Sequence, residues 1–247
     1  WYLETSSIKT PFPGWISIPS SFVSLFIFYI LSYLLSKTMG CFSGCLMSSA
    51  SVQKLFCEQL KKEIVWREAP LYAVNLTLDA ATAHPALFLS EEGRRVTWKE
   101  PFQDLPSCSQ RFVSLPCALG QLHVSSGRYF WEVGVGDAHS WDLGVCRDNV
   151  TKKGRVAMSP QNGFWAIRLY EGEYWGLKSV ETSLTLKEKP CRVGVFLDYE
   201  AGDVSFYNMA DGSHIFTFSE QTFYGVLRPF FRLWSSDSGS LTIVQVE

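Results

Sequence analysis

The chain has 247 residues, of which 47% are hydrophobic and 15% aromatic, so it can bury a substantial core and is not globally disordered. Its formal net charge of -2 lacks the basic excess of nucleic-acid-binding proteins, so we expect no nucleic-acid partner. Its 7 cysteines include no CxxC pair and no histidine at zinc spacing, so we predict no metal site and expect reduced, buried thiols.

An uncharged stretch lies between Lys9 and Lys37, and its most apolar part, residues 15–36, is about as long as a bilayer-spanning helix. Trp15 stands at one end, where aromatic residues suit the membrane interface. More lysines follow the stretch than precede it, which places the C-terminal part of the chain in the cytoplasm. We therefore predict a short N-terminal flank, residues 1–14, and one transmembrane helix. A cleaved signal peptide is the alternative, although its apolar region is usually shorter and follows a basic start.

Residues 37–66 are the expected juxtamembrane segment, which ends in a short helix. Within residues 51–66 one apolar stripe recurs among polar residues, the pattern of an amphipathic helix. The stripe covers only about two heptads, so it fits either a dimerising stalk or a helix packed on the following domain, and we favour the second. Cys41 and Cys45 lie where cysteines can be palmitoylated, although two unmodified thiols fit equally well.

Beyond Pro70, runs rich in aromatic and β-branched residues alternate with turn signals, which predicts an all-β sandwich. The runs that predict strands are residues 129–135, 141–146, 164–170, 193–199, 204–208, 214–218 and 241–246. Glu171-Gly172 and Asp211-Gly212 supply the residues that tight hairpins need for positive φ. The sequence shows neither a strand–helix–strand rhythm nor a fixed repeat, which disfavours a parallel α/β fold and a propeller.

Motifs in this region resemble, in order, those of the PRY–SPRY domain, also called B30.2. They are Leu76-Thr-Leu-Asp79, Ser126-Gly-Arg-Tyr-Phe-Trp-Glu-Val133, Trp141-Asp-Leu-Gly-Val-Cys146, Asn162-Gly-Phe-Trp165, Leu197-Asp-Tyr-Glu200 and Arg228-Pro-Phe-Phe231. The resemblance implies a bent antiparallel β-sandwich at residues 67–247, with a PRY part at about 67–122 and a SPRY part at about 123–247.

Within this family, residues 141–169 and 197–218 are most similar to butyrophilins of the milk-fat-globule type. A membrane span, a short helix and then PRY–SPRY is also the butyrophilin order. Two departures are Ala80, where the family usually has proline, and the lack of an immunoglobulin domain, which butyrophilins carry outside the membrane. Tripartite-motif ubiquitin ligases share the domain, but their RING and B-box Cys/His spacings are not found here.

The resemblance implies a single-pass membrane protein, anchored through residues 15–36, whose cytoplasmic domain binds a protein partner. Xanthine oxidoreductase is the partner that the milk-fat type suggests, and the family's roles are milk-fat secretion and T-cell regulation. One alternative is a substrate-recognition fragment of a tripartite-motif ubiquitin ligase. The sequence leaves the oligomeric state open.

A second alternative is a sensor of phosphorylated metabolites, because some butyrophilins hold a pyrophosphate in a basic pocket of this domain. Several converging cations are needed for such a ligand. Of the basic residues carried over by the resemblance, only Arg232 is retained. Asp142, Ala157, Trp175 and Glu181 stand at other positions of that pocket, so we predict no phosphate-ligand binding.

We predict a protein-binding module without catalytic activity or cofactor, because no nucleophile elbow, P-loop, zinc-protease or dinucleotide motif occurs in the sequence. Loops carry function in sandwiches, and aromatic residues at exposed turns suit interface hot spots. The candidate contact residues are Asp137, His139, Trp141, Tyr170, Glu171, Tyr174, Trp175 and Arg232. For Trp141 we favour packing in the core over contact with a partner. For Tyr174 and Trp175 these two roles are equally expected.

Overall fold

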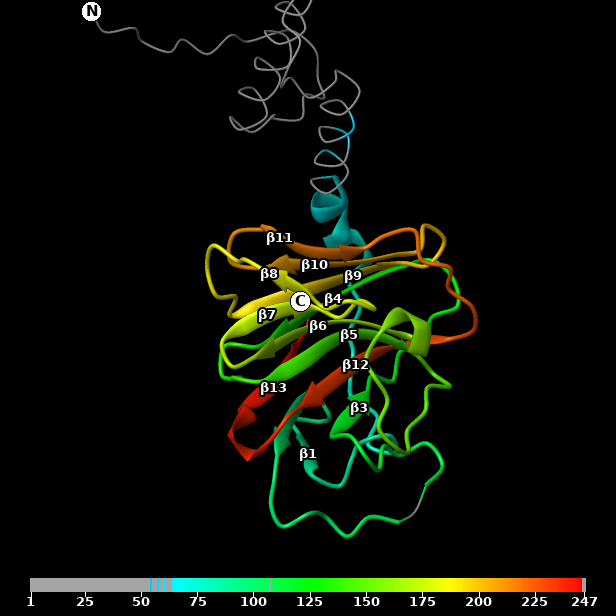
Figure 1. Cartoon of the computed structure of the whole chain (residues 1–247), viewed down its shortest axis with the longest axis vertical. Helices are drawn as coiled ribbons and strands as arrows, with labels where there is room; N and C mark the ends of the chain where they lie inside the picture. The colour runs from blue at the N-terminus through cyan, green and yellow to red at the C-terminus, as the bar shows by residue number, and fades with distance from the viewer. Residues whose placement is uncertain (1–53, 55–56, 58–59, 61–63, 107, 246–247) are drawn as a thin grey trace, which may run out of the picture. The chain divides into compact units, whose positions relative to one another are not determined.

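The computed structural model describes residues 54, 57, 60, 64–106 and 108–245, and its strands form two antiparallel sheets (Figure 1). From edge to edge, the seven-stranded sheet consists of β1 (Leu87–Ser90), β2 (Arg95–Trp98), β13 (Ser240–Val244), β4 (Arg128–Gly134), β9 (Arg192–Asp198), β10 (Asp203–Asn208) and β11 (His214–Phe218). The six-stranded sheet consists of β3 (Cys117–Leu119), β12 (Leu227–Leu233), β5 (Trp141–Arg147), β6 (Phe164–Tyr170), β7 (Glu173–Gly176) and β8 (Thr182–Leu184). The predicted all-β antiparallel sandwich is confirmed.

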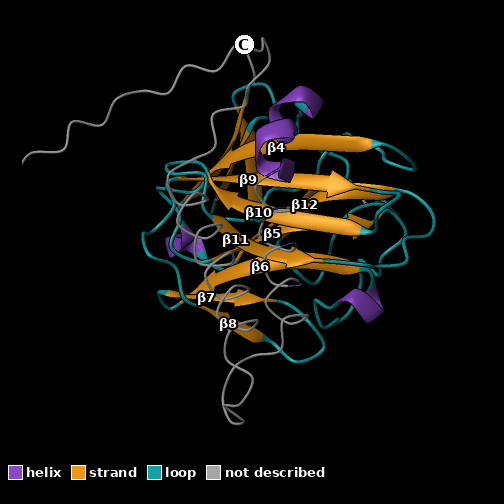
Figure 2. Ribbon diagram, turned by 90° about the horizontal axis from the view of Figure 1, so that it is seen from above, coloured by secondary structure: helices purple, strands orange, loops and turns teal. Residues whose placement is uncertain are grey.

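The main core lies between the two sheets, whose strands overlap in the view of Figure 2. Its largest side chains include Trp131, Trp141 and Trp165, each at most 1% exposed. The strands that supply them alternate, because successive side chains point to opposite faces of a sheet. In β10, for example, Val204 and Phe206 enter this core.

The other face of the seven-stranded sheet is partly covered by the segment that precedes it. Residues 64–68 are helical and continue into the 3-10 helix η1 (Ala69–Tyr72). Trp66 packs on Tyr207 of β10 with ring centroids 5.3 Å apart, and Ala69 is fully buried in the same cluster. Aromatic contact therefore attaches the end of the expected 51–66 helix to the sheet.

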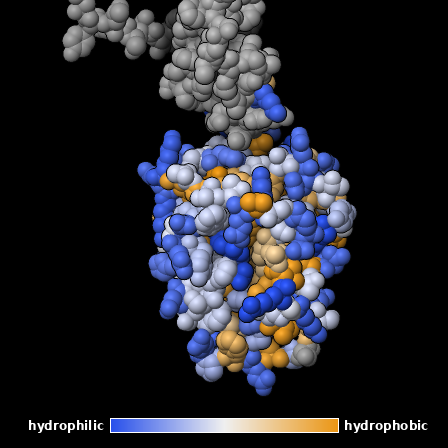
Figure 3. All heavy atoms as spheres, in the orientation of Figure 1, coloured by the Kyte–Doolittle hydropathy of each residue, from blue (hydrophilic) through white to orange (hydrophobic). Residues whose placement is uncertain are grey.

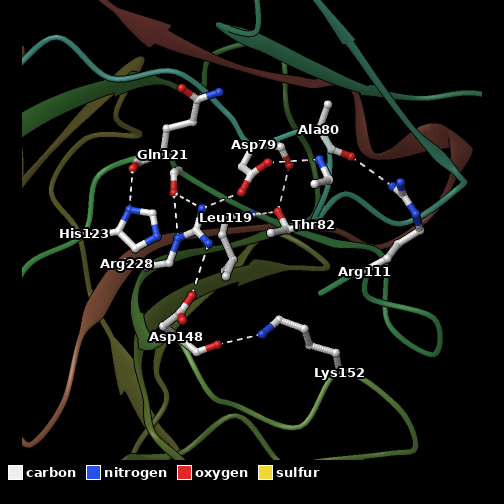
Figure 4. A network of polar contacts seen from close by, with 12 residues as sticks. Asp79, Ala80, Thr82, Arg111, Leu119, Gln121, His123, Asp148, Lys152 and Arg228 are labelled. Atoms are coloured by element: carbon white, nitrogen blue, oxygen red, sulfur yellow. Dashed lines mark hydrogen bonds and ion pairs between the residues drawn. The ribbon is translucent and has the colours of Figure 1, made fainter. Parts of the chain in front are cut away.

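A buried arginine ties the PRY-like part of the chain to the SPRY-like part (Figure 4). Arg228 of β12 is 2% exposed and donates from Nη2 to Asp79 at 2.8 Å and from Nη1 to Asp148 at 3.1 Å. Its Nε and Nη2 also donate to the carbonyl of Gly120, at 2.9 and 2.7 Å. A single side chain thus joins three segments that are far apart in the sequence.

The predicted transmembrane helix at residues 15–36, Cys41 and Cys45 lie outside the described residues. Among the helices that the structure does describe, none has the length and apolar character to cross a membrane.

The described cysteines are free thiols: Cys57, Cys108, Cys117, Cys146 and Cys191. Burial raises the pKa of Cys117 and of Cys146 well above the usual range.

Candidate functional site

A row of side chains crosses the outer face of the six-stranded sheet, and we name it the polar row. Its members are paired in register on five neighbouring strands: Arg232 (β12), Asp142 (β5), Arg168 (β6), Trp175 (β7) and Ser183 (β8). Their strand neighbours, which include Trp141, Leu169 and Leu233, belong to the core between the sheets. Because side chains alternate along a strand, the polar row faces away from that core.

The carboxylate of Asp142 is the centre of the row and is completely buried. It accepts two hydrogen bonds from Arg168, from Nε at 2.8 Å and from Nη2 at 3.1 Å. Nη1 of Arg232 donates a third at 3.1 Å, and the indole Nε1 of Trp234 donates a fourth at 3.0 Å. Four donors around its two oxygens satisfy the hydrogen-bonding capacity of the carboxylate, which in turn holds three side chains in place.

Trp234 forms an aromatic layer over these charges. The guanidinium carbons of Arg232 and Arg168 lie 3.9 and 4.7 Å from its ring centroid. The ring of Tyr170 packs against it at 4.7 Å, and Tyr170 is 38% exposed. Cation–π contact strengthens when the cation is desolvated, so the two arginines and the indole stabilise one another. The result is a partly exposed aromatic surface whose rings pack on one another and on the two guanidinium groups.

Charges in the row are balanced within the domain. Glu181 accepts a hydrogen bond from Nη1 of Arg168 at 2.9 Å and is half exposed. Burial disfavours the charged form of Arg168, but the hydrogen bonds and charges of Asp142 and Glu181 outweigh it and raise the pKa of Arg168. Two guanidinium groups therefore face two carboxylates, so their charges are balanced without an added anion.

The structure divides the candidate contact residues into three groups. Trp141 is fully buried and Tyr174 is 9% exposed, and their rings pack edge-on in the core at 6.2 Å, so neither ring belongs to the outer surface of the polar row. Trp175 and Arg232 are members of the polar row, Tyr170 packs on Trp234 beside it, and the exposed Glu171 begins the turn after Tyr170. Asp137 and His139 are exposed on the loop between β4 and β5.

Sequence reasoning did not select two central members of the site, Arg168 and Trp234. A charged residue inside the otherwise apolar run of β6 is a signal that could have indicated Arg168, because a buried cation requires a partner. No comparable signal marks Trp234, which lies after the end of β12 and reaches Asp142 only through folding.

Asp198 ends β9 and Glu200 follows it two residues later, and both carboxylates have partners within the fold. Asp198 accepts hydrogen bonds from Arg128 at 2.7 Å and from the backbone of Ala201 at 2.9 Å. Both oxygens of Glu200 lie 2.9 Å from the backbone nitrogen of Gly127. These groups fix turns, as expected for acidic residues at the end of a strand.

The described surface mixes polar and apolar residues. On the face drawn in Figure 3, hydrophobic residues form a band between strongly hydrophilic ones. Several large hydrophobic side chains of the described residues are exposed, among them Phe102, Val113, Tyr170 and Tyr224. A mixture of this kind is normal for a protein surface, so a binding site has to be argued from geometry.

Comparison with known proteins agrees with this architecture. Residues 76–123 match the SPRY-associated domain, PRY, and residues 128–245 match the SPRY domain. Butyrophilin subfamily 1 member A1 of Homo sapiens is 54% identical over 189 residues, which are 76% of this chain and 36% of that protein. E3 ubiquitin-protein ligase TRIM58 of Mus musculus is 50% identical over 161 residues, 65% of this chain and 33% of that protein.

Among solved structures, the TRIM65 PSpry domain superposes with a TM-score of 0.63 at 21% identity, over 73% of this chain and 95% of that one. This likeness concerns the fold alone. The chain spans about a third of the length of the curated relatives that it matches.

Proposed function

The chain belongs to the butyrophilin family of PRY–SPRY proteins, and on that basis we propose that its PRY–SPRY domain binds a protein partner through the polar row. The observation that carries the proposal is the layer of Tyr170 and Trp234 over the Asp142 ion pairs. Tyrosine, tryptophan and arginine are the residues most enriched in binding hot spots. Here their contacts with one another already restrict them before any partner arrives, which should reduce the entropy lost on binding.

The charge balance of the row favours a protein over a phosphorylated metabolite. A pyrophosphate needs cations that are free to pair with it, but Arg168 and Arg232 already pair with Asp142. Adding an anion would place it near the buried carboxylate. A polypeptide can instead use the exposed aromatic ring of Tyr170 and the outer edges of the guanidinium groups.

Our first candidate for the partner is xanthine oxidoreductase, because the domain resembles that of milk-fat butyrophilins.

We further propose that residues 15–36 anchor the protein in a membrane with the domain on the cytoplasmic side. This proposal rests on the uncharged stretch and on the lysines that follow it. Roles in milk-fat secretion or in T-cell regulation would follow from the family.

A second candidate is the recognition of a substrate for ubiquitin transfer. It is supported by the 50% identity to a relative whose name is E3 ubiquitin-protein ligase TRIM58. In that case the polar row would bind the protein to be modified, and the transfer machinery would belong to another polypeptide segment. Both candidates use the same surface, so one experiment on that surface bears on both.

Site-specific cross-linking tests the surface directly. A photo-reactive benzoylphenylalanine at position 170 of the full chain should cross-link to xanthine oxidoreductase in a cell extract. The same group at position 224, an exposed tyrosine that precedes β12, lies near the opposite end of the strands and should not. Cross-links from position 224 alone would move the binding surface to that end, and mass spectrometry of the position-170 product would identify any other partner.

A further inference from the structure

A small pocket opens at one end of the sandwich, between the β4–β5 loop, the β6–β7 turn and the loop before β9. Its volume is about 210 Å³, and it is lined by His139, Leu169, Gly172, Tyr174 and Lys189. Leu169 and Tyr174 point to the inner face of the six-stranded sheet, whereas the polar row lies on the outer face. The pocket is therefore a separate site.

The hydroxyl of Tyr174 is the feature that calls for an explanation. Tyr174 is 9% exposed, and its hydroxyl oxygen has no hydrogen-bond partner among the described residues. Buried polar atoms are nearly always paired, because an unpaired one destabilises the fold. Burial, helped by nearby Cys191, raises the pKa of Tyr174 to about 12, so the hydroxyl carries its proton at neutral pH and has no acceptor for it among the described residues.

The rest of the lining supplies positive charge and a firm frame. Lys189 and His139 are the other polar side chains of the pocket, and no carboxylate is among its lining residues. The backbone nitrogen of His139 donates to the carbonyl of Ser238 at 2.8 Å, which fixes the β4–β5 loop. Glu171 and Gly172 both have positive φ, 51° and 82°, as a two-residue hairpin turn requires.

We propose that this pocket binds one carboxylate group of a peptide, the side chain of an aspartate or glutamate in the protein partner. The Tyr174 hydroxyl would donate to the carboxylate, Lys189 would pair with its charge, and Leu169 would contact its methylene groups. Pockets for drug-sized ligands occupy roughly 300–1,000 Å³, so this one suits a single side chain rather than a metabolite. The inference deepens the proposed protein-binding function by naming the chemistry of one contact.

The test uses the full chain and a small probe, so that it does not depend on the identity of the partner. N-acetyl-glutamic acid N-methylamide is titrated into the isotope-labelled protein, and the amide signals of Gly172 and His139 are followed by NMR. We expect a saturable shift with this probe and none with its glutamine counterpart, which has the same shape without the charge. Tyr174→Phe and Lys189→Gln should each weaken binding about tenfold, the size of a lost hydrogen bond or pairing with a charged group.

Two controls keep the result clear. Lys153→Gln removes an exposed lysine from the loop between β5 and β6 and should leave the affinity unchanged. Tyr174→Phe removes only a hydroxyl that has no partner, so this variant should unfold at the same temperature as the original chain or at a higher one.

Equal shifts with the glutamine compound, or an unchanged affinity in Tyr174→Phe, would overturn the carboxylate site. A shift with inorganic phosphate but not with the glutamate probe would overturn the peptide carboxylate as its occupant. Failure of this test leaves the cross-linking at position 170 unaffected, because that experiment reports on the outer face of the sheet.

Discussion

Asp142 and Arg168 face each other on neighbouring strands of the six-stranded sheet and form a two-pronged ion pair, with N–O distances of 2.8 and 3.1 Å. The carboxylate is fully buried, and it also accepts from Arg232 and Trp234. One acidic side chain therefore organises the cations and the aromatic ring of the proposed binding surface. Its loss should affect both the stability of the domain and its ability to bind a protein.

Asp142→Ala should destabilise the domain by about 3–5 kcal/mol, because it leaves two largely buried guanidinium groups without their shared partner. Urea unfolding, followed by tryptophan fluorescence, measures the change. Glu181→Gln is the matched control, since Glu181 is half exposed and its pairing with Arg168 is worth about 1 kcal/mol or less. Equal losses in the two variants would argue against Asp142 as the organising residue.

Arg228→Met should loosen the PRY-like part before the rest of the domain. The substitution keeps an apolar stem but removes the donors to Asp79, Asp148 and the Gly120 carbonyl. Both carboxylates keep some contact with water, so the expected loss is about 3 kcal/mol, the lower end of the range for a broken buried pair. Hydrogen exchange should accelerate first at Leu78 and its neighbours, and uniform acceleration across both sheets would contradict this account of the arginine.

His84 should make the stability of the domain fall in mild acid. The Ala86 amide donates to Nδ1 of His84 at 3.1 Å, so the ring is neutral with its proton on Nε2, which donates to the Val113 carbonyl at 3.0 Å. Burial lowers the pKa of His84, and the Val113 bond only partly opposes it. The folded pKa is thus below the unfolded value of about 6.5, so the unfolded state binds more protons between the two values.

It follows that the contribution of His84 is complete above about pH 6.5 and is lost as the pH falls through the folded pKa. The free energy of unfolding, measured at several pH values from about 7.5 down to about 5, should show this decline. In His84→Asn the amide oxygen can still accept from Ala86 but does not titrate, so the part of the decline due to this residue should disappear. An identical decline in the variant would assign the effect to other groups.

Phosphate ligands should bind poorly. Because Asp142 already pairs with Arg168 and Arg232, calorimetry with inorganic pyrophosphate should detect no binding tighter than about 1 mM. The same titration of Asp142→Asn, if the variant is folded, tests whether the carboxylate is the cause. Tight binding by the original chain would contradict the assignment of the row to a protein partner.

Much of the fold could be predicted from local patterns. The runs at residues 164–170 and 214–218 coincide with β6 and β11, because alternation and turn residues are encoded within a few positions. β12 is harder to predict, since Pro229 in a central strand argues against such an assignment. In the structure Pro229 lies opposite Gly120, whose backbone nitrogen donates to the Pro229 carbonyl, but proline has no N–H to donate in return. The Gly120 carbonyl accepts a hydrogen bond from the side chain of Arg228 instead.

The site was less predictable than the fold. Tyr170 and Arg232 could be selected from the turn and from the family resemblance. Arg168 is indicated only by its charge inside an apolar strand, and Trp234 by no local signal. Trp234 and Asp142 are 92 residues apart, and only the strand order β12–β5–β6 brings them together. Core packing, the role favoured for Trp141, is confirmed by its full burial, whereas for Tyr174 no local pattern near the turn distinguishes an inward ring from an outward one.

The most direct measurement of the central claim is the affinity of purified xanthine oxidoreductase for the full chain and for two variants, by biolayer interferometry. Tyr170→Ser removes the exposed ring that packs on Trp234, and Tyr224→Ser removes an exposed ring near the opposite end of the strands. We predict that the first weakens binding about tenfold or more, as loss of a hot-spot residue does, and that the second leaves it unchanged. Equal affinities for the two variants would contradict the polar row as the binding surface, and no binding to any of the three chains would contradict xanthine oxidoreductase as the partner.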